Sequence, residues 1–230
     1  MKKKVVLVFA SVVAILLGMP GTASANHSLG PTYHWLKKPW DFGIVVEIAD
    51  RSDGASGGPM VPFPLNQASW DWDNGTPNVS LGYRWWNCSS AVANCVTVWE
   101  DNSLGQGTFG QMSVFRSTTS NGVTHMLDVH VQLNPDPLGN GNAAGGVTEN
   151  ATQARKTTCH ELGHALGLAH IADTTSCMPQ GPALDESTNP PTSLISTVPN
   201  QHDFDTITAQ HNHTHRQIQR TDDEPATAPE

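Results

Sequence analysis

An eleven-residue stretch, HELGHALGLAH, which begins at His160 and ends at His170, constrains this chain more than any other part of its sequence. On a helix, His160 and His164 lie one turn apart and point the same way, with Glu161 beside them. Gly167 can adopt the positive backbone angle that ends a helix, so the chain can turn and bring His170 back as a third ligand. Three histidine ligands leave the fourth tetrahedral position of a zinc ion open for water. The stretch therefore predicts a catalytic zinc site with Glu161 as its general base.

Coincidence is the alternative explanation, in which a surface helix happens to carry histidines. At average residue usage, the shorter pattern His-Glu-x-x-His occurs by chance in roughly one chain of this length in a few hundred. The further requirement for Gly167 and His170 lowers that frequency to roughly one in a hundred thousand. The zinc site is therefore the better interpretation.

Five residues of the stretch resemble the HExxHxxGxxH consensus of the metzincin metallopeptidases: His160, Glu161, His164, Gly167 and His170. The resemblance implies a zinc-dependent endopeptidase, a hydrolase that cleaves peptide bonds. It also implies an α+β fold, with a twisted mixed β-sheet, an active-site helix above the cleft and a small C-terminal subdomain that ends in a helix. We expect the substrate to lie extended along an edge strand, for which residues 108–115 are the candidate.

Metzincins also carry a methionine in a tight turn beneath the zinc. The stretch SCMP supplies this residue as Met178, eight residues beyond His170, much as in the matrixin branch. Ile171 follows the third histidine, where matrixins usually have Ser and adamalysins Asp. Gln180 stands where astacins and serralysins have Tyr. A matrixin-like secreted peptidase of bacterial type is the nearest description, and Asp173 is a candidate partner for a ligand histidine.

Residues 1–25 have the pattern of a secretory signal peptide rather than that of a folded element. Three lysines at positions 2–4 precede an apolar run at 5–17, and the residues Ala-Ser-Ala at 23–25 form a small-residue cleavage site. A retained membrane anchor is the alternative, but the apolar run is short for a membrane span. We therefore expect a secreted, extracellular mature chain that begins at Asn26.

Export affects how the four cysteines are interpreted, because an oxidising compartment favours disulfides. Three pairings are possible from the sequence alone. Cys88 and Cys95 would close a short loop, and Cys159 and Cys177 flank the zinc segment. A role as zinc ligand competes for the latter two, although three histidines already supply the protein's ligands. The resemblance places the methionine turn beneath the zinc, and so it implies the pairs Cys159–Cys177 and Cys88–Cys95.

The charge of the chain limits its partners. The formal net charge is −9 for the full sequence, and it falls to −12 when the three lysines of the signal peptide leave. A chain this acidic has no general attraction for nucleic acid or for anionic membranes. About 205 mature residues fit one peptidase domain at 26–213, followed by a disordered acidic tail at 214–230. We expect a monomer that acts on a peptide or protein substrate and has no membrane contact after signal cleavage.

Local patterns predict the elements around the site. Strands are predicted at residues 43–49, 79–86, 96–100, 108–115 and 127–133. Helices are predicted from residue 65 to 72, from about Asn150 through the zinc motif, and from a cap at Asn200 to about His211. The sheet-facing side of the active-site helix is expected to comprise Ala151, Thr158, Leu162, Ala165 and Leu166. All seven tryptophans lie between residues 35 and 99. Core packing is their expected role, and an aromatic binding surface is the alternative.

Other metal sites have weaker support. Related peptidases bind calcium in loops near residues 134–146. This loop contains one acid, Asp136, and one carboxylate with backbone carbonyls is weak support for a calcium site. Histidines at 202, 211, 213 and 215 could bind a second metal, although histidines in a polar tail are ordinarily solvated.

Two other classes of function remain open. The chain could be a catalytically inactive extracellular zinc-binding protein, or a binding module on the same fold in which zinc is structural. Glu161 argues against both, because a structural site needs a fourth protein ligand and no general base.

Overall fold

The computed structural model describes residues 28–30, 33–37, 43–52, 63–90, 94–101, 103–104, 107–120, 123–135, 147–185 and 192–211. The predicted signal peptide and acidic tail lie outside these residues, as do Asp136 of the calcium hypothesis and the histidines at 213 and 215. Within the described ranges, no helix has the length and apolar character needed to cross a membrane.

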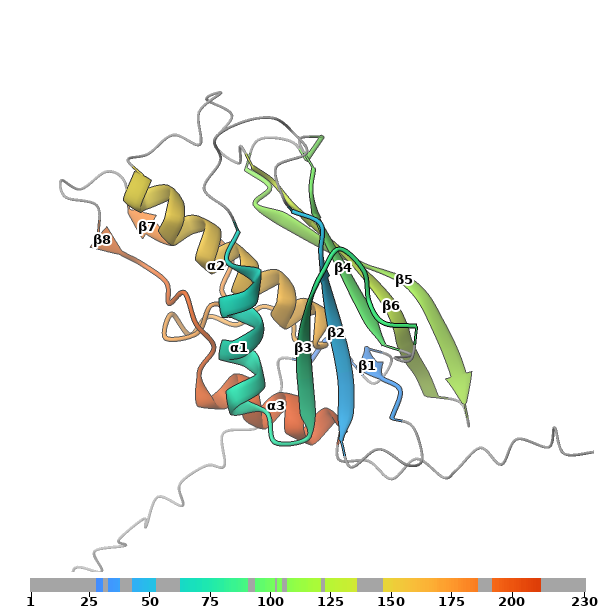
Figure 1. Cartoon of the computed structure of the whole chain (residues 1–230). Coiled ribbons are helices and arrows are strands. Elements are labelled where there is room, and N and C mark those ends of the chain that lie inside the picture. Colours follow the sequence, from blue (N-terminus) through green and yellow to red (C-terminus); the bar gives the residue numbers. More distant parts are fainter. Residues whose placement is uncertain are drawn as a thin grey trace, which may run out of the picture.

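A six-stranded mixed sheet forms the centre of the structure (Figure 1). Its strands are β1 (His34–Trp35), β2 (Ile44–Asp50), β3 (Val79–Trp85), β4 (Cys95–Glu100), β5 (Gly110–Ser120) and β6 (Val123–Leu133). The strands β3, β2, β4 and β6 are parallel neighbours in that order, and β1 pairs in parallel with β6. On its other side β6 pairs with β5, which is antiparallel. The five predicted strands thus correspond to β2 through β6, although β5 begins and ends later than expected and β6 begins earlier.

Helices cover one face of this sheet. They are α1 (Leu65–Gly75), α2 (Val147–Ala165) and α3 (Gln201–His211). A second, two-stranded sheet pairs β7 (Leu184–Asp185) with β8 (Thr192–Ser193). Figure 1 shows α1 and α2 side by side against the sheet, with α3 at one end of both. The described chain is therefore a mixed α/β fold with a largely parallel sheet and three helices.

Helix α2 attaches the candidate site to the core. Thr158, Leu162, Ala165 and Leu166 are each at most 1% exposed, as predicted for its sheet-facing side. Ala151 is exposed, so the prediction for that residue was wrong: it precedes the packed part of the helix. The helix also begins at Val147, earlier than the expected start at Asn150.

The tryptophans divide between the core and the surface. Trp35 and Trp72 are wholly buried, and their indole N–H groups donate to the carbonyls of Ala165 and Cys159. Trp70, Trp85 and Trp86 are between 50% and 61% exposed, so core packing was the wrong expectation for these three. Trp70 lies on the outer side of α1, and the other two lie where β3 ends.

The predicted alternation of buried and less buried side chains along β6 holds from Val129 to Leu133. Val129, Val131 and Leu133 are wholly buried, but Leu127 is only partly buried and Met126 takes its place in the core. The cause is an irregular pairing with β5, which skips between Val114 and Ser117 and so changes which side chains face the helices.

A reciprocal cap begins α3. Asn200 Oδ1 accepts the backbone N–H of Asp203, and the Asp203 carboxylate accepts the backbone N–H of Asn200. The same carboxylate accepts the Ser176 hydroxyl at 2.8 Å, although Asp203 is wholly buried. The helix is therefore tied to the turn that carries Met178, and Ile207 and His211 are among the buried residues of the helix.

We predict that Asp203→Asn lowers the free energy of unfolding by about 1.5–3 kcal/mol, because an amide weakens two charge-assisted hydrogen bonds of a buried group. Asp205→Asn on the same helix is the matched control. Asp205 is exposed, and its one hydrogen bond within the described part of the chain is to the Gln201 side chain, so the change should stay within about 0.5 kcal/mol. Urea unfolding of both variants measures the difference, and equal effects would contradict the role given to Asp203.

Candidate active site

Three histidine nitrogens converge at the end of α2. The Nε2 atom of His164 lies 3.0 Å from that of His160 and 3.1 Å from that of His170, and the third side of the triangle is 3.1 Å. A tetrahedral zinc ion with Zn–N distances of 2.0–2.1 Å separates its ligand nitrogens by about 3.3 Å. Among the described residues, this is the one group of His, Cys, Asp and Glu side chains whose geometry could hold a metal ion.

The end of α2 brings the third histidine into place. Gly167 has φ +94°, and the backbone N–H groups of Gly167 and Leu168 donate to the carbonyls of His164 and Gly163. These two bonds form a Schellman motif, which satisfies the last carbonyls of the helix and turns the chain back. A side chain at Gly167 would overlap the carbonyl oxygen of Tyr33. Both the backbone angle and the space therefore require glycine here.

Backbone carbonyls orient two of the rings. The Nδ1 atom of His160 lies 2.9 Å from the Cys177 carbonyl oxygen, and that of His164 lies 2.7 Å from the Leu168 carbonyl oxygen. A carbonyl can only accept, so each Nδ1 carries the proton and each Nε2 directs its lone pair at the common centre. The hypothesis that Asp173 supports a ligand is wrong, because its carboxylate accepts from Thr175 and Asn200 instead.

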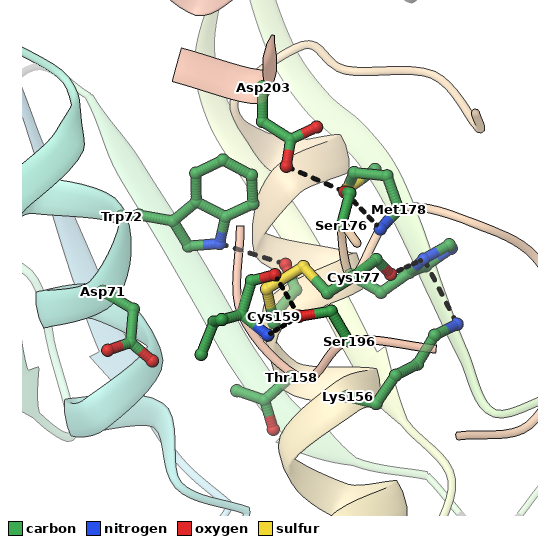
Figure 2. Close-up of a disulfide and its surroundings, with 12 residues drawn as sticks. Asp71, Trp72, Lys156, Thr158, Cys159, Ser176, Cys177, Met178, Ser196 and Asp203 are labelled. Carbon is green, nitrogen blue, oxygen red and sulfur yellow. Dashed lines mark hydrogen bonds between the residues drawn. A yellow bond between two sulfur atoms is a disulfide. The ribbon is translucent and has the colours of Figure 1, made fainter. Parts of the chain in front are cut away.

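The turn with Met178 packs against α2. Met178 is wholly buried, and a Cβ on Gly163 of α2 would overlap its sulfur. The Met178 backbone N–H donates to the Ser176 hydroxyl, which in turn donates to Asp203. Figure 2 shows this turn joined to α2 by the Cys159–Cys177 disulfide, with Trp72 of α1 bonded to Cys159 and Asp203 of α3 bonded to Ser176. The second disulfide joins Cys88 and Cys95, so the structure brings both expected pairs together.

Glu161 lies between the histidines and the edge strand β5. The residue is 4% exposed, and a Cβ at Gly110 would come within 2.6 Å of its Cγ. Burial raises the pKa of Glu161 to about 8, and the positive charge of Lys156 opposes this shift. The first residue of β5 must therefore be glycine for the carboxyl to occupy this position.

An open cavity of about 580 Å³ gives access to the group. The three histidines and Glu161 line it on one side, and residues 107–112 line it on another. The predicted substrate strand, 108–115, thus includes the residues of β5 that border the cavity. The cavity beside the three histidines and Glu161 is large enough for a peptide segment.

Sequence reasoning missed Lys156, which also lines the cavity. It is 2% exposed, and its ammonium donates to the Pro179 carbonyl at 2.8 Å. Burial lowers the pKa of Lys156 to about 8, and the Glu161 carboxylate opposes that shift. The signal was present in the spacing, because Lys156 precedes His160 by four residues and so shares the ligand-bearing side of the helix.

Comparisons with known proteins add a distant similarity. No protein-family model matches the sequence, and no curated protein matches it. Among solved structures, the crystal structure of archaemetzincin from Methanopyrus kandleri is similar, with 12% sequence identity and a TM-score of 0.39. The similarity covers 76% of this chain and 98% of that chain. At this TM-score the similarity carries no functional assignment, which depends instead on the geometry of the site.

The buried histidines predict that the metal-free protein loses stability on acidification. Burial lowers the pKa of His160 to about 2 and that of His164 to about 4. In the unfolded chain each titrates near 6.5, so below that pH the unfolded state binds protons that the folded state does not. Each of these histidines should therefore subtract about 1.4 kcal/mol from the free energy of unfolding per pH unit below 6.5, down to its folded pKa.

A variant isolates this contribution, because Glu161 acts in the opposite direction: its raised pKa makes the folded state bind a proton first. Metal-free wild type and His164→Gln should be unfolded in urea at pH 7 and at pH 5. The wild type should lose about 2 kcal/mol more than the variant between these values. An identical pH dependence would contradict the burial of a neutral imidazole at this position.

The Cys159–Cys177 bridge should support metal binding as well as stability. Closing a loop of this size stabilises a fold by about 3 kcal/mol, and Cys177 also supplies the carbonyl that orients His160. Replacing both cysteines by alanine should weaken zinc affinity about 10- to 100-fold, as for lost partners of metal ligands. The control replaces Cys88 and Cys95, which should lower stability but leave zinc affinity unchanged. Competition with a zinc chelator measures the zinc affinity of both double variants. Equal losses of zinc affinity in the two would contradict a special role of the Cys159–Cys177 bridge.

Proposed function

We propose that this chain is a zinc-dependent endopeptidase. The supporting observation is the convergence of three histidine Nε2 atoms beside a buried glutamate, in a cavity bordered by an edge strand. His160, His164 and His170 would hold the ion, since their number, ring orientation and spacing suit a zinc site with an open fourth position. Among the described residues, no other group of His, Cys, Asp and Glu side chains could hold a metal ion.

The chemistry follows from the residues around the cavity. When bound, zinc supplies a Lewis acid that polarises the scissile carbonyl and lowers the pKa of water. Glu161 would take a proton from the attacking water and pass it to the leaving amine. The edge strand β5 would hold an extended peptide through its unpaired backbone groups, because β6 occupies only one of its sides. The absence of a side chain at Gly110 leaves space for the Glu161 carboxyl beside β5, where that peptide would lie.

The finer assignment is also a proposal. We infer a matrixin-like branch from the HExxHxxGxxH residues and the spacing of Met178, and a secreted monomer from the signal-peptide pattern of residues 1–25 and the acidic charge. The peptidase domain would comprise residues 26–213, and peptides or proteins would be its substrates. Calcium is not required by any described contact of the site.

Replacement of the general base tests the proposal. Glu161→Gln should retain about one equivalent of zinc, because the histidine ligands are unchanged. Hydrolysis of an unfolded protein such as casein should fall by at least about a hundredfold. Asp205→Asn, an acid-to-amide change on the surface of α3, should leave both zinc content and hydrolysis unchanged.

Two results would sink the proposal. Zinc-loaded wild type that hydrolyses neither casein nor a peptide library would leave the alternative of an inactive zinc-binding protein. A fully active Glu161→Gln variant would show that another group takes the proton. Chelator treatment that abolishes hydrolysis, with recovery on added zinc, ties the activity to the metal.

A further inference from the structure

A positively charged side chain that the proposed mechanism does not use, Lys156, lines the cavity. Apart from the histidines, Lys156 and Glu161 are the only ionisable side chains among the residues that line it. Lys156 lies on α2, one turn before His160, and Figure 2 shows its side chain extending toward the segment of Cys177. Gln180 and Gly181, just beyond the methionine turn, line the same part of the cavity.

The Lys156 ammonium is buried with incomplete hydrogen bonding. One N–H donates to the Pro179 carbonyl. The His160 Nδ1 atom lies 3.4 Å away, but it already donates its own proton to Cys177 and so cannot accept. No carboxylate of the described residues forms an ion pair with Lys156. Among the described residues, two of its three N–H groups therefore have no acceptor, which is costly for a cation that is 2% exposed.

A second donor lies next to the lysine. The Thr157 hydroxyl oxygen accepts the Gln153 side-chain amide at 2.9 Å, and this leaves the hydroxyl hydrogen free to donate. Thr157 is 3% exposed and lines the cavity beside Lys156. A buried ammonium and a buried hydroxyl, adjacent in the chain and bordering one cavity, match the acceptor-only character of a carboxylate.

Support of Glu161 is the alternative role for this lysine. The two opposite charges line the same cavity and so attract one another. They are not in ion-pair contact, however, and the Glu161 carboxyl lies against Gly110 of β5. An electrostatic influence on the general base would alter the hydrolysis of every substrate equally, whereas a binding role would discriminate between substrates.

We propose that Lys156, with Thr157, forms an anion-binding subsite that selects peptides carrying a carboxylate close to the scissile bond. The inference rests on the proposed peptidase function. The chain has a formal net charge of −9, so a general attraction cannot bring acidic peptides to it. Recognition would come from the local donors of the subsite, the Lys156 ammonium and the Thr157 hydroxyl. The carboxylate could belong to an Asp or Glu side chain or to the C-terminus of the peptide, and both present the same chemistry.

Matched peptides test the selection. Zinc-loaded wild type is given peptides with an amidated C-terminus that differ only by Glu or Gln at each position around the cleaved bond. A second set has Gln throughout and a free C-terminal carboxylate at the same distances. At one position, the value of kcat/KM should be about 10- to 100-fold higher for the carboxylate than for its amide, as expected for charge-assisted hydrogen bonds. The set that shows the preference identifies the source of the carboxylate.

Variants assign the preference to the lysine. Lys156→Met should remove it by lowering kcat/KM for the acidic peptide alone, and Lys156→Arg should retain most of it. Arg155→Met is the control, because it removes the neighbouring charge of α2, which pairs with Asp71 outside the cavity. Equal cleavage of Glu and Gln peptides by wild type would overturn the proposal. So would a Lys156→Met variant that loses activity equally on both peptides, which would indicate support of Glu161.

Binding separates this proposal from the peptidase assignment. Calorimetry with zinc-loaded Glu161→Gln measures the affinity for the same acidic and amide peptides without turnover. If the zinc-loaded wild type cleaves none of the peptides but the variant binds the acidic peptide more tightly, the subsite is retained and the peptidase function is refuted. If the wild type cleaves the peptides with no preference in rate or affinity, the peptidase function is retained and the subsite is refuted. The wild-type comparison decides the matter even if Lys156→Met does not fold.

Discussion

The hydrogen bond from His160 Nδ1 to the Cys177 carbonyl joins the two segments on which the site depends. It fixes the ring of the first ligand, and it can form only if the methionine turn lies directly beside α2. The adjacent disulfide holds the turn there covalently, and Asp203 holds it from the other side through Ser176. The turn, the helix that carries two ligands and the C-terminal helix are thus one connected unit, and loss of any of these bonds affects the geometry of the metal ligands.

The sequence predicted the convergence of the three histidines better than it predicted what surrounds them. The ligand spacing and Gly167 follow from helix geometry, which is local, so three converging nitrogens could be expected from eleven residues. The support of His160 and His164 could not, because backbone carbonyls carry no sequence signal, and Asp173 was the wrong candidate. The strands were found from local patterns, but their order depends on contacts between distant segments, which no single pattern contains.

Burial was predicted least well, and for a physical reason. A residue two turns from Thr158 has the same direction on α2, yet Ala151 is exposed because the helix extends past the surface on which it packs. Trp85 and Trp86 are large apolar side chains that a core would accommodate, but they lie at the end of β3. Periodicity gives the direction of a side chain, and the extent of the neighbouring element decides whether anything covers it.

Burial also explains why the charges of the site occur together. The same removal from water that keeps His160 and His164 neutral, and so able to bind a metal, disfavours the carboxylate of Glu161 and the ammonium of Lys156. Each of the two charges lessens the penalty of the other without forming a contact. A carboxyl group and an ammonium group can therefore both line this cavity, with the Glu161 carboxyl against β5 and the Lys156 ammonium near Pro179.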